Sequence, residues 1–228
     1  MKSLSQYNSE HNFLFEFRET RIKKCIKIIR NLNRGCFLDI GCSTGEWGEF
    51  WLKDGWDVFG IDIDKMHLNE AESKGVKASY CDLNREKLPF NDNFFDLIFA
   101  GEVIEHLIDT DGFLQELHRC LKPGGFILIT TPNLVSIENR VRILFGLYPL
   151  WVDYRLQGSG HVRAYTTTVL KKQLQESGFK VRKTTGNWAP FIPQRFFNDI
   201  QLPWLSFTGS LFPRMAMDII VLAQKSMS

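Results

Sequence analysis

The chain has 228 residues, of which 44% are hydrophobic and 24% are charged, and its formal net charge is +2. This length can bury a full hydrophobic core, so we expect a single domain over residues 1–228. The near-neutral charge excludes a strong overall attraction to nucleic acid or to an anionic membrane. No apolar run approaches the roughly 18 residues of a transmembrane segment, and the polar N-terminus lacks the apolar centre of a signal peptide. Five cysteines without metal-binding spacings indicate free thiols and a cytoplasmic protein.

The expected elements begin with a helix over residues 13–32, within an N-terminal helical cap over residues 1–34. Strands and helices then alternate over residues 35–131, which predicts an α/β fold with a doubly wound, mostly parallel sheet and helices on both faces. Two long segments, 132–165 and 186–216, interrupt this rhythm, and long connections in compact domains are usually functional. The remaining expected elements are two helices, Ile137–Phe145 and Thr167–Ser177, and two strands, Phe179–Thr184 and Met217–Gln224.

Two of the expected strands end in an acidic residue, Asp39 or Asp62. The first strand runs directly into a small-residue turn framed by Gly41 and Gly45. A buried parallel strand followed by such a turn lets the backbone approach a nucleotide-like ligand, and an acid about twenty residues later can bind ribose hydroxyls. Ser43 stands where a dinucleotide site would have its middle glycine. We therefore expect a nucleoside without phosphates and not a nicotinamide dinucleotide.

Further motifs follow in order along the chain. A third apolar segment ends in Asp82, a buried strand breaks at Gly101 into the start of a helix, and a glycine turn at Leu121–Gly125 feeds a fifth strand. This ordered set resembles the class I S-adenosylmethionine-dependent methyltransferases, and within them the branch of ubiquinone-biosynthesis O-methyltransferases and bacterial small-molecule and glycan methyltransferases. The motifs that carry the resemblance are Asp39-x-Gly41-x-x-x-Gly45, Asp62, Asp82, Phe95–Asp96, Glu105–His106 and Leu121–Gly125.

The resemblance implies a Rossmann-like sheet of seven strands with the last strand antiparallel, and S-adenosyl-L-methionine as cofactor. In such enzymes the first turn meets the cofactor, the equivalent of Asp62 takes the ribose hydroxyls, and the equivalent of Asp82 takes the adenine amino group. Gly101 and Glu102 would border the methionine half, and Arg21 would face its carboxylate unless it only lies on a solvated helix face. The expected cofactor-binding residues are Arg21, Asp39, Gly41, Cys42, Ser43, Gly45, Asp62, Ile63, Asp82, Leu83, Gly101 and Glu102.

The resemblance also predicts methyl transfer to a small-molecule, glycan or lipid-linked acceptor, at oxygen. An alcohol or phenol acceptor must lose its proton, and a histidine suits that role. The candidate bases are His161, which follows a glycine-rich loop, and His106. We expect residues 132–165 and 186–216 to form the acceptor site. The aromatic and proline-rich second segment is either core packing, an apolar lid, or a surface for peripheral membrane contact.

A metal is not expected, although one motif raises the question. On a helix Glu102, Glu105 and His106 would share a face, a spacing that can hold a divalent cation. RNA-end 2′-O-methyltransferases use a similar motif but follow it with further histidines, whereas here the next histidine is His118, well along the next helix. Two alternative functions remain open: an RNA methyltransferase, which the low net charge disfavours, and a cofactor-binding module without catalysis.

Overall fold

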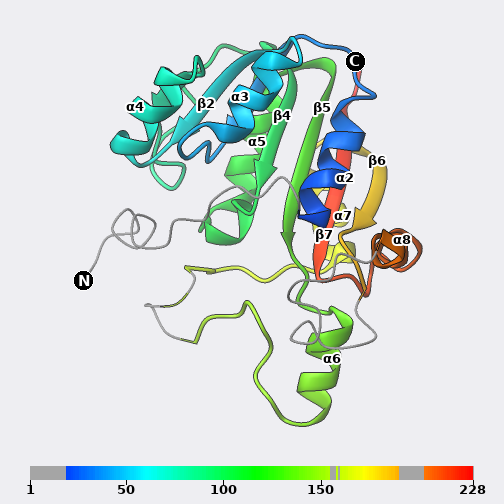
Figure 1. The fold of residues 1–228 in the computed structure, drawn as a ribbon. Coiled ribbons are helices and arrows are strands. Elements are labelled where there is room, and N and C mark those ends of the chain that lie inside the picture. The colour runs from blue at the N-terminus through cyan, green and yellow to red at the C-terminus, as the bar shows by residue number, and fades with distance from the viewer. Residues whose placement is uncertain (1–18, 155–157, 159, 190–202, 228) are drawn as a thin grey trace.

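The computed structural model describes residues 19–154, 158, 160–189 and 203–227, with side chains in the last range from residue 206. One seven-stranded sheet forms the centre, with strand order β3-β2-β1-β4-β5-β7-β6 (Figure 1). β7 is antiparallel to both β5 and β6, whereas the other neighbouring strands are parallel. The strands are β1 Cys36–Ile40, β2 Asp57–Asp62, β3 Lys77–Tyr80, β4 Phe95–Gly101, β5 Leu121–Pro132, β6 Phe179–Gly186 and β7 Asp218–Lys225. The predicted Rossmann-like topology is confirmed.

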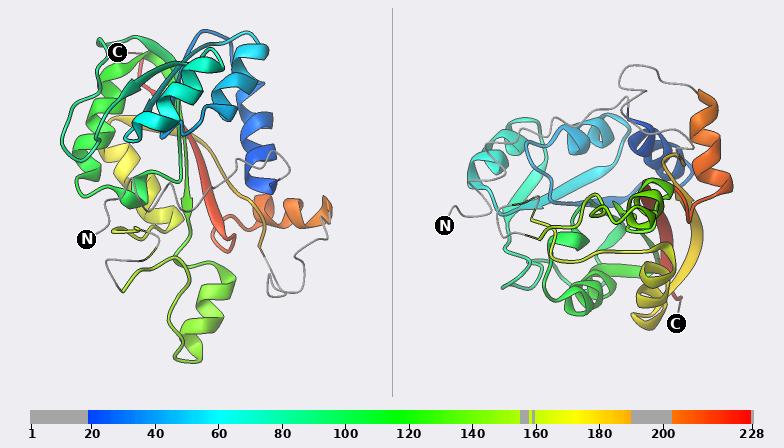
Figure 2. Two further views of the ribbon diagram at one scale, coloured as in Figure 1. Left: turned by 60° about the vertical axis from the view of Figure 1, so that its left-hand side comes forward. Right: turned by 90° about the horizontal axis from the view of Figure 1, so that it is seen from below.

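Helices cover both faces of this sheet. Seen from below, α2, α3 and α4 lie on one face, and α5 and α7 lie on the other (Figure 2). Each face has its own buried cluster, one around Trp51 and Phe37 and the other around Ile98 and Leu114. The helices are α2 Thr20–Ile29, α3 Glu46–Lys53, α4 Lys65–Ser73, the 3₁₀ turn η1 Ile104–His106, α5 Thr110–Cys120, α6 Ile137–Leu144, α7 Thr167–Glu176 and α8 Pro203–Leu211. Among the described residues, no helix has the length and apolar character to cross a membrane.

Two helix predictions differ from the structure. The N-terminal helix ends at Ile29 and not at residue 32, where the sequence predicted its end. Ile22, Cys25 and Ile29 complete its buried stripe. The part predicted before residue 19 lies outside the described residues. After β4 the chain forms only the short 3₁₀ turn instead of a helix. The reason is local: Glu102 adopts a positive φ of 56°, which a right-handed helix does not accommodate.

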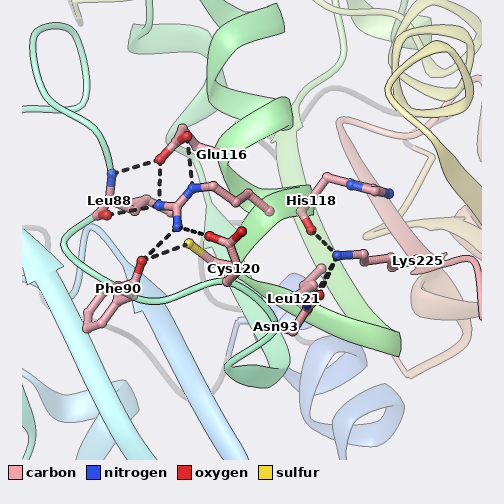
Figure 3. Close-up of polar contacts among 10 residues, drawn as sticks. Leu88, Phe90, Asn93, Glu116, His118, Cys120, Leu121 and Lys225 are labelled. Carbon is pink, nitrogen blue, oxygen red and sulfur yellow. Dashed lines mark hydrogen bonds and ion pairs between the residues drawn. The ribbon is translucent and has the colours of Figure 1, made fainter.

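Lys225, the last residue of β7, binds the connection between α5 and β5 at the amino end of β5 (Figure 3). Its ammonium group donates to the carbonyl oxygens of His118 and Leu121, at 2.7 and 2.9 Å, and to Oδ1 of Asn93 at 2.8 Å. An ammonium has three protons, so all three of its donors are used here. These contacts fix the α5–β5 connection and leave the opposite edge, where β1, β2 and β4 end, for a ligand.

Candidate cofactor and acceptor site

The loop between β1 and α3 has left-handed backbone at Gly41, Ser43 and Gly45, with φ of 71°, 46° and 83°. The N–H groups of Gly41 and Cys42 both donate to the carbonyl oxygen of Ile61, at 2.8 and 2.9 Å, which folds the loop over the end of β2. A Cβ on Gly45 would lie 2.7 Å from Cα of a residue in α4. Glycine is therefore required at position 45 both by backbone conformation and by close packing.

Asp62 ends β2 and points its carboxylate between the two loops at this edge. Its Oδ2 accepts from the N–H of Ser43 and its Oδ1 from the N–H of Asp64, both at 2.9 Å. Each carboxylate oxygen has two acceptor positions, so each can take a further donor such as a hydroxyl. Asp39, at the end of β1, is 3% exposed, and its pKa is raised well above the usual range by burial and then by the charge of Asp62.

Asp82 lies just beyond the end of β3, next to the end of β2. The N–H of Cys81 donates to the carbonyl oxygen of Asp62 at 3.0 Å, which joins the two segments. Oδ1 of Asp82 accepts from the N–H of Asn84 at 3.0 Å, and Arg85 lies 3.4 Å from Oδ2. The structure thus places the predicted acids at the carboxyl ends of three adjacent parallel strands. Ile63 and Leu83 directly follow two of these acids in the sequence.

Arg21, on α2, reaches the same edge from the other side. Its Nη1 donates to Oγ1 of Thr130 at 3.0 Å and lies 3.3 Å from Oε1 of Glu102. Its Nε lies 2.9 Å from Glu19 and 3.8 Å from Asp218. Burial lowers the pKa of the guanidinium, but the attraction of Glu102, Glu19 and Asp218 outweighs burial and leaves this pKa raised. Arg21 is therefore not on a solvated face, which was the alternative interpretation.

Glu102, after Gly101 at the end of β4, belongs to this network. Its Oε1 accepts from Oγ1 of Thr130 at 2.7 Å, and its N–H donates to the carbonyl oxygen of Thr130 at 3.0 Å. Asp218 was missed by the sequence reasoning. Burial and the charge of Glu102 raise its pKa well above the usual range. The sequence did offer a signal for it: Asp218 directly precedes a strongly apolar run, much as the acids of β1 and β2 directly follow apolar runs.

The two candidate bases lie against each other, although 54 residues separate them in the chain. The ring centroids of His106 and His161 are 4.8 Å apart, with an angle of 72° between the ring planes. The segment that carries His161 crosses η1, because the N–H groups of Val162 and Arg163 donate to the carbonyl oxygen of Glu105 at 2.8 and 3.0 Å. One ligand atom each from Glu105, His106 and His161 lie within 4.8 Å of one another.

The sequence argument against a metal considered only the histidines that follow the motif along the chain, of which His118 is the next. The structure brings the more distant His161 beside Glu105 and His106. The sequence argument also placed Glu102 on the same helical face as Glu105. In the structure Glu102 lies within 3.3 Å of Arg21, outside the cluster of three. The contact of His161 with Glu105 and His106 joins distant parts of the chain, so the local sequence spacing gives no sign of it.

Backbone carbonyl oxygens fix the proton on each imidazole ring. Nδ1 of His106 lies 3.1 Å from the carbonyl oxygen of Gly160, and Nδ1 of His161 lies 3.0 Å from that of Trp151. A carbonyl oxygen only accepts, so Nδ1 carries a proton in both rings. Burial, followed by the neighbouring His161, lowers the pKa of His106 to about 4, which keeps its ring neutral at neutral pH.

The segment 132–165, which is predicted to form part of the acceptor site, begins at the same edge of the sheet, where β5 ends. The N–H of Leu134 donates to the carbonyl oxygen of Tyr165 at 2.8 Å, which closes the segment into a loop that carries α6 away from the sheet (Figure 1). A small hollow of about 10 Å³ lies here, enough for about one water molecule. Its lining residues are Glu105, Pro132, Leu134, Leu150, Trp151, Val152, His161, Arg163, Ala164 and Tyr165. The walls combine apolar side chains with a carboxylate, an imidazole and a guanidinium.

The segment 186–216 is described only in part, since residues 190–202 lie outside the described residues. The described part includes α8, which packs against β6. Three apolar side chains on α8 and just after it are exposed: Phe207 by 63%, Leu211 by 56% and Phe212 by 46%. Nζ of Lys24 donates to Oγ of Ser210 at 3.0 Å and so ties α8 to α2.

Comparison with known proteins decides the family. Residues 13–184 match the family described as "Methyltransferase domain". The chain belongs to the class I S-adenosylmethionine-dependent methyltransferases. The fold agrees with solved structures of this class. One from Mesorhizobium loti has a TM-score of 0.64 at 15% identity and covers 91% of this chain and 99% of its own. Another, from Thermotoga maritima, has a TM-score of 0.68 at 18% identity and covers 96% of each chain.

Curated relatives of this methyltransferase include two named O-methyltransferases. A malonyl-[acyl-carrier protein] O-methyltransferase of Hamiltonella defensa is 30% identical over 115 residues, which are 50% of this chain and 45% of the relative. A ubiquinone biosynthesis O-methyltransferase of Sinorhizobium fredii is 27% identical over 172 residues, which are 73% of this chain and 65% of the relative. The chain thus spans about half to two thirds of the length of these relatives.

Proposed function

We propose that this methyltransferase transfers a methyl group from S-adenosyl-L-methionine to an oxygen atom of a small acceptor molecule. The observation that carries the proposal is the contact between the rings of His106 and His161 at the carboxyl edge of the sheet, where a backbone carbonyl oxygen lies against Nδ1 of each ring. In open parallel sheets, ligands bind outside this edge. Two relatives with different named acceptors are both O-methyltransferases, which supports oxygen as the methylated atom.

For the cofactor we propose the crevice between the β1–α3 loop and the ends of β2 and β3. Three features support this position: the turn at Gly41, the free acceptor positions on Asp62, and the carboxylate of Asp82 next to them. The other proposed contacts are Arg21, Asp39, Cys42, Ser43, Gly45, Ile63, Leu83, Gly101 and Glu102. Because Arg21 is already paired with Glu102 and Asp218, it would hold a ligand carboxylate only by sharing its donors.

When bound, the sulfonium cofactor supplies an electrophilic methyl group, so the protein needs mainly to align the acceptor and exclude water. An alcohol or phenol must also lose its proton, and a neutral imidazole Nε2 can accept it. His161 lines the small hollow beside Glu105, so we assign it this role, with His106 packed against it. The proposed step is therefore proton transfer from the acceptor hydroxyl to Nε2 of His161 during attack on the methyl carbon.

The acceptor could be free, glycan-attached or lipid-linked. Of these, we propose an apolar or lipid-linked small molecule, since α8 exposes the apolar side chains of Phe207 and Leu211. Peripheral membrane contact through residues 186–216 belongs to the same proposal. A cytoplasmic location is also proposed, and the five free cysteines support a reducing compartment.

Two measurements test the function in order. First, calorimetry should show that S-adenosylmethionine and its demethylated product bind close to one per chain; the absence of binding would contradict the proposal. Second, a screen of hydroxylated acceptors with labelled methyl donor should yield a methyl ether or ester. With that acceptor, His161→Ala should keep cofactor affinity and lower turnover by roughly 10²–10⁴-fold, the usual contribution of a general base. Full turnover in this variant would remove His161 from the mechanism.

A further inference from the structure

Glu105, His106 and His161 meet at η1, and each offers one atom that could bind a metal ion. Glu105 is 1% exposed, and its Oε2 accepts from Oγ1 of Thr131 at 2.9 Å. Its other oxygen, Oε1, is buried and has no hydrogen-bond partner among the described residues. A buried carboxylate oxygen without a donor is costly, about 1–3 kcal/mol or more for a charged group. Such an atom calls for a positively charged ligand.

The two histidines beside Glu105 are oriented in the manner of metal ligands. Metal-bound histidines usually donate their second ring N–H to a backbone carbonyl or a carboxylate, which fixes the tautomer. Here Nδ1 of His106 is held by Gly160 at 3.1 Å and Nδ1 of His161 by Trp151 at 3.0 Å. Nε2 is therefore the nitrogen of each ring that would bind a metal, and one ligand atom from each residue lies within 4.8 Å of the others. The described groups supply one carboxylate and two imidazoles.

We propose that Glu105, His106 and His161 bind one divalent transition-metal cation, of the class of Zn²⁺ or Co²⁺. Two imidazoles and one carboxylate suit these borderline cations, whereas Mg²⁺ and Ca²⁺ prefer oxygen ligands. Three protein ligands leave at least one coordination position open, as in catalytic sites. Glu105 and His161 both line the small hollow, so the open position faces the space proposed for the acceptor.

A neighbouring acid helps to hold the backbone that carries the third proposed ligand, His161. Asp153 adds a second nearby carboxylate, whose Oδ2 accepts from the N–H of His161 at 3.0 Å. This contact fixes the backbone that carries the third ligand.

A bound metal would change how the acceptor hydroxyl is activated in the proposed methyl transfer. With a cation bound, His161 would hold the metal, and the metal would lower the pKa of an acceptor hydroxyl that it binds. The metal site does not depend on this reaction, because cation binding can be measured without an acceptor. Binding of the cation would therefore change the role of His161 from base to metal ligand, whereas absence of cation binding would leave the proposed methyl transfer with a histidine base intact.

The test is a calorimetric titration of the metal-free full chain with Co²⁺, with Mg²⁺ as the contrasting ion. We expect one Co²⁺ per chain and no comparable binding of Mg²⁺. Loss of an outer contact to a metal-bound histidine already costs about 10–100-fold in affinity. Glu105→Gln, His106→Ala and His161→Ala should therefore each weaken Co²⁺ binding by at least about 100-fold, by the same reasoning.

Two controls keep the result interpretable. His118→Ala removes a histidine that packs on Phe179 outside the cluster, so it should bind Co²⁺ as the wild type does. Visible absorption of the Co²⁺ complex distinguishes these ligands from cysteine thiolates, which give sulfur charge-transfer bands. His161 lies in a partly exposed loop, so its variant should fold even if Glu105→Gln does not. Wild type without stoichiometric Co²⁺ binding, or a His161→Ala variant with unchanged affinity, would overturn the proposal.

Discussion

Gly45 offers a direct test of why the first loop contains glycines. We consider Gly45→Ala, with Gly146→Ala as its matched control. Both glycines have positive φ, 83° and 69°. An added Cβ at Gly45 would lie 2.7 Å from Cα and 2.8 Å from Cβ of Ala71 in α4, whereas nothing lies within 4 Å of a Cβ at Gly146. The two substitutions thus share the backbone strain and differ in the collision.

The expected loss of stability follows from these two terms. Left-handed backbone costs a residue with a Cβ about 1–2 kcal/mol. Overpacking against a fixed neighbour adds about 1–3 kcal/mol. Gly45→Ala should therefore lower the free energy of unfolding by about 2–5 kcal/mol, and Gly146→Ala by about 1–2 kcal/mol. For a chain of this size, each kcal/mol corresponds to roughly 2–4 °C in Tm.

Urea denaturation, followed by circular dichroism, measures both losses. The reasoning requires a clear difference between the variants at similar m-values, because only Gly45 packs against α4. If the two variants lost the same stability, the contact with Ala71 would not be what requires glycine at position 45. The sequence interpretation, close approach of the cofactor to the turn, would then be the better explanation. In that case Gly45→Ala would weaken the binding of S-adenosylmethionine and would lower the free energy of unfolding no more than the control does.

Three further predictions concern the polar contacts at both edges of the sheet. Asp62→Ala should weaken S-adenosylmethionine binding in calorimetry by about 1.5–3 kcal/mol for each lost bond to a charged group, and unchanged affinity would exclude the ribose assignment. Arg21→Met should lower the free energy of unfolding by about 3–5 kcal/mol, because Glu102 and Asp218 lose their counter-charge; a thermal melt close to wild type would show that water replaces it. Lys225→Met should lower Tm without changing cofactor affinity, since its three acceptors lie at the other edge; reduced affinity in calorimetry would contradict this.

The fold was predictable because its signals are local. Apolar runs that end in Asp39 and Asp62, each followed by a turn and a helix, specify parallel strands without knowledge of any distant contact. The helix predicted at Ile137–Phe145 is found at Ile137–Leu144. The segment after Gly101 was mispredicted, because a helical pattern of side chains says nothing about a single left-handed residue such as Glu102.

The acceptor side was predictable only in outline. The long segment 132–165 was assigned to the carboxyl edge from topology alone, and it begins there, where β5 ends. The meeting of His161 with Glu105 depends on two backbone hydrogen bonds across η1 and on a carbonyl from Trp151. No periodicity encodes such contacts, because each depends on the path of an irregular loop. The same reason explains why Asp218 was missed as the buried partner of Arg21.

The strained backbone of this protein gathers where the ligands are proposed to bind. Among the described residues, four non-glycine residues have positive φ: Ser43, Asn93, Glu102 and Trp151. Asn93 is of a type that tolerates this conformation, and it contacts Lys225 at the other edge. Serine, glutamate and tryptophan tolerate it less well, and each costs about 1–3 kcal/mol in such a position.

Two of these three strained residues direct a backbone group at a residue of the proposed site, and the third shapes the turn before it. The N–H of Ser43 donates to Asp62, and the carbonyl oxygen of Trp151 accepts from Nδ1 of His161. The N–H of Glu102 donates across to β5 and turns η1, with His106, toward the loop of His161. Folding alone would favour relaxed backbone at all three positions. Their shared location indicates that the loops are shaped to fix the carboxylate of Asp62, which is proposed to bind the ribose, and the imidazole tautomers before a ligand arrives, and a methyl-transfer site requires such fixed groups.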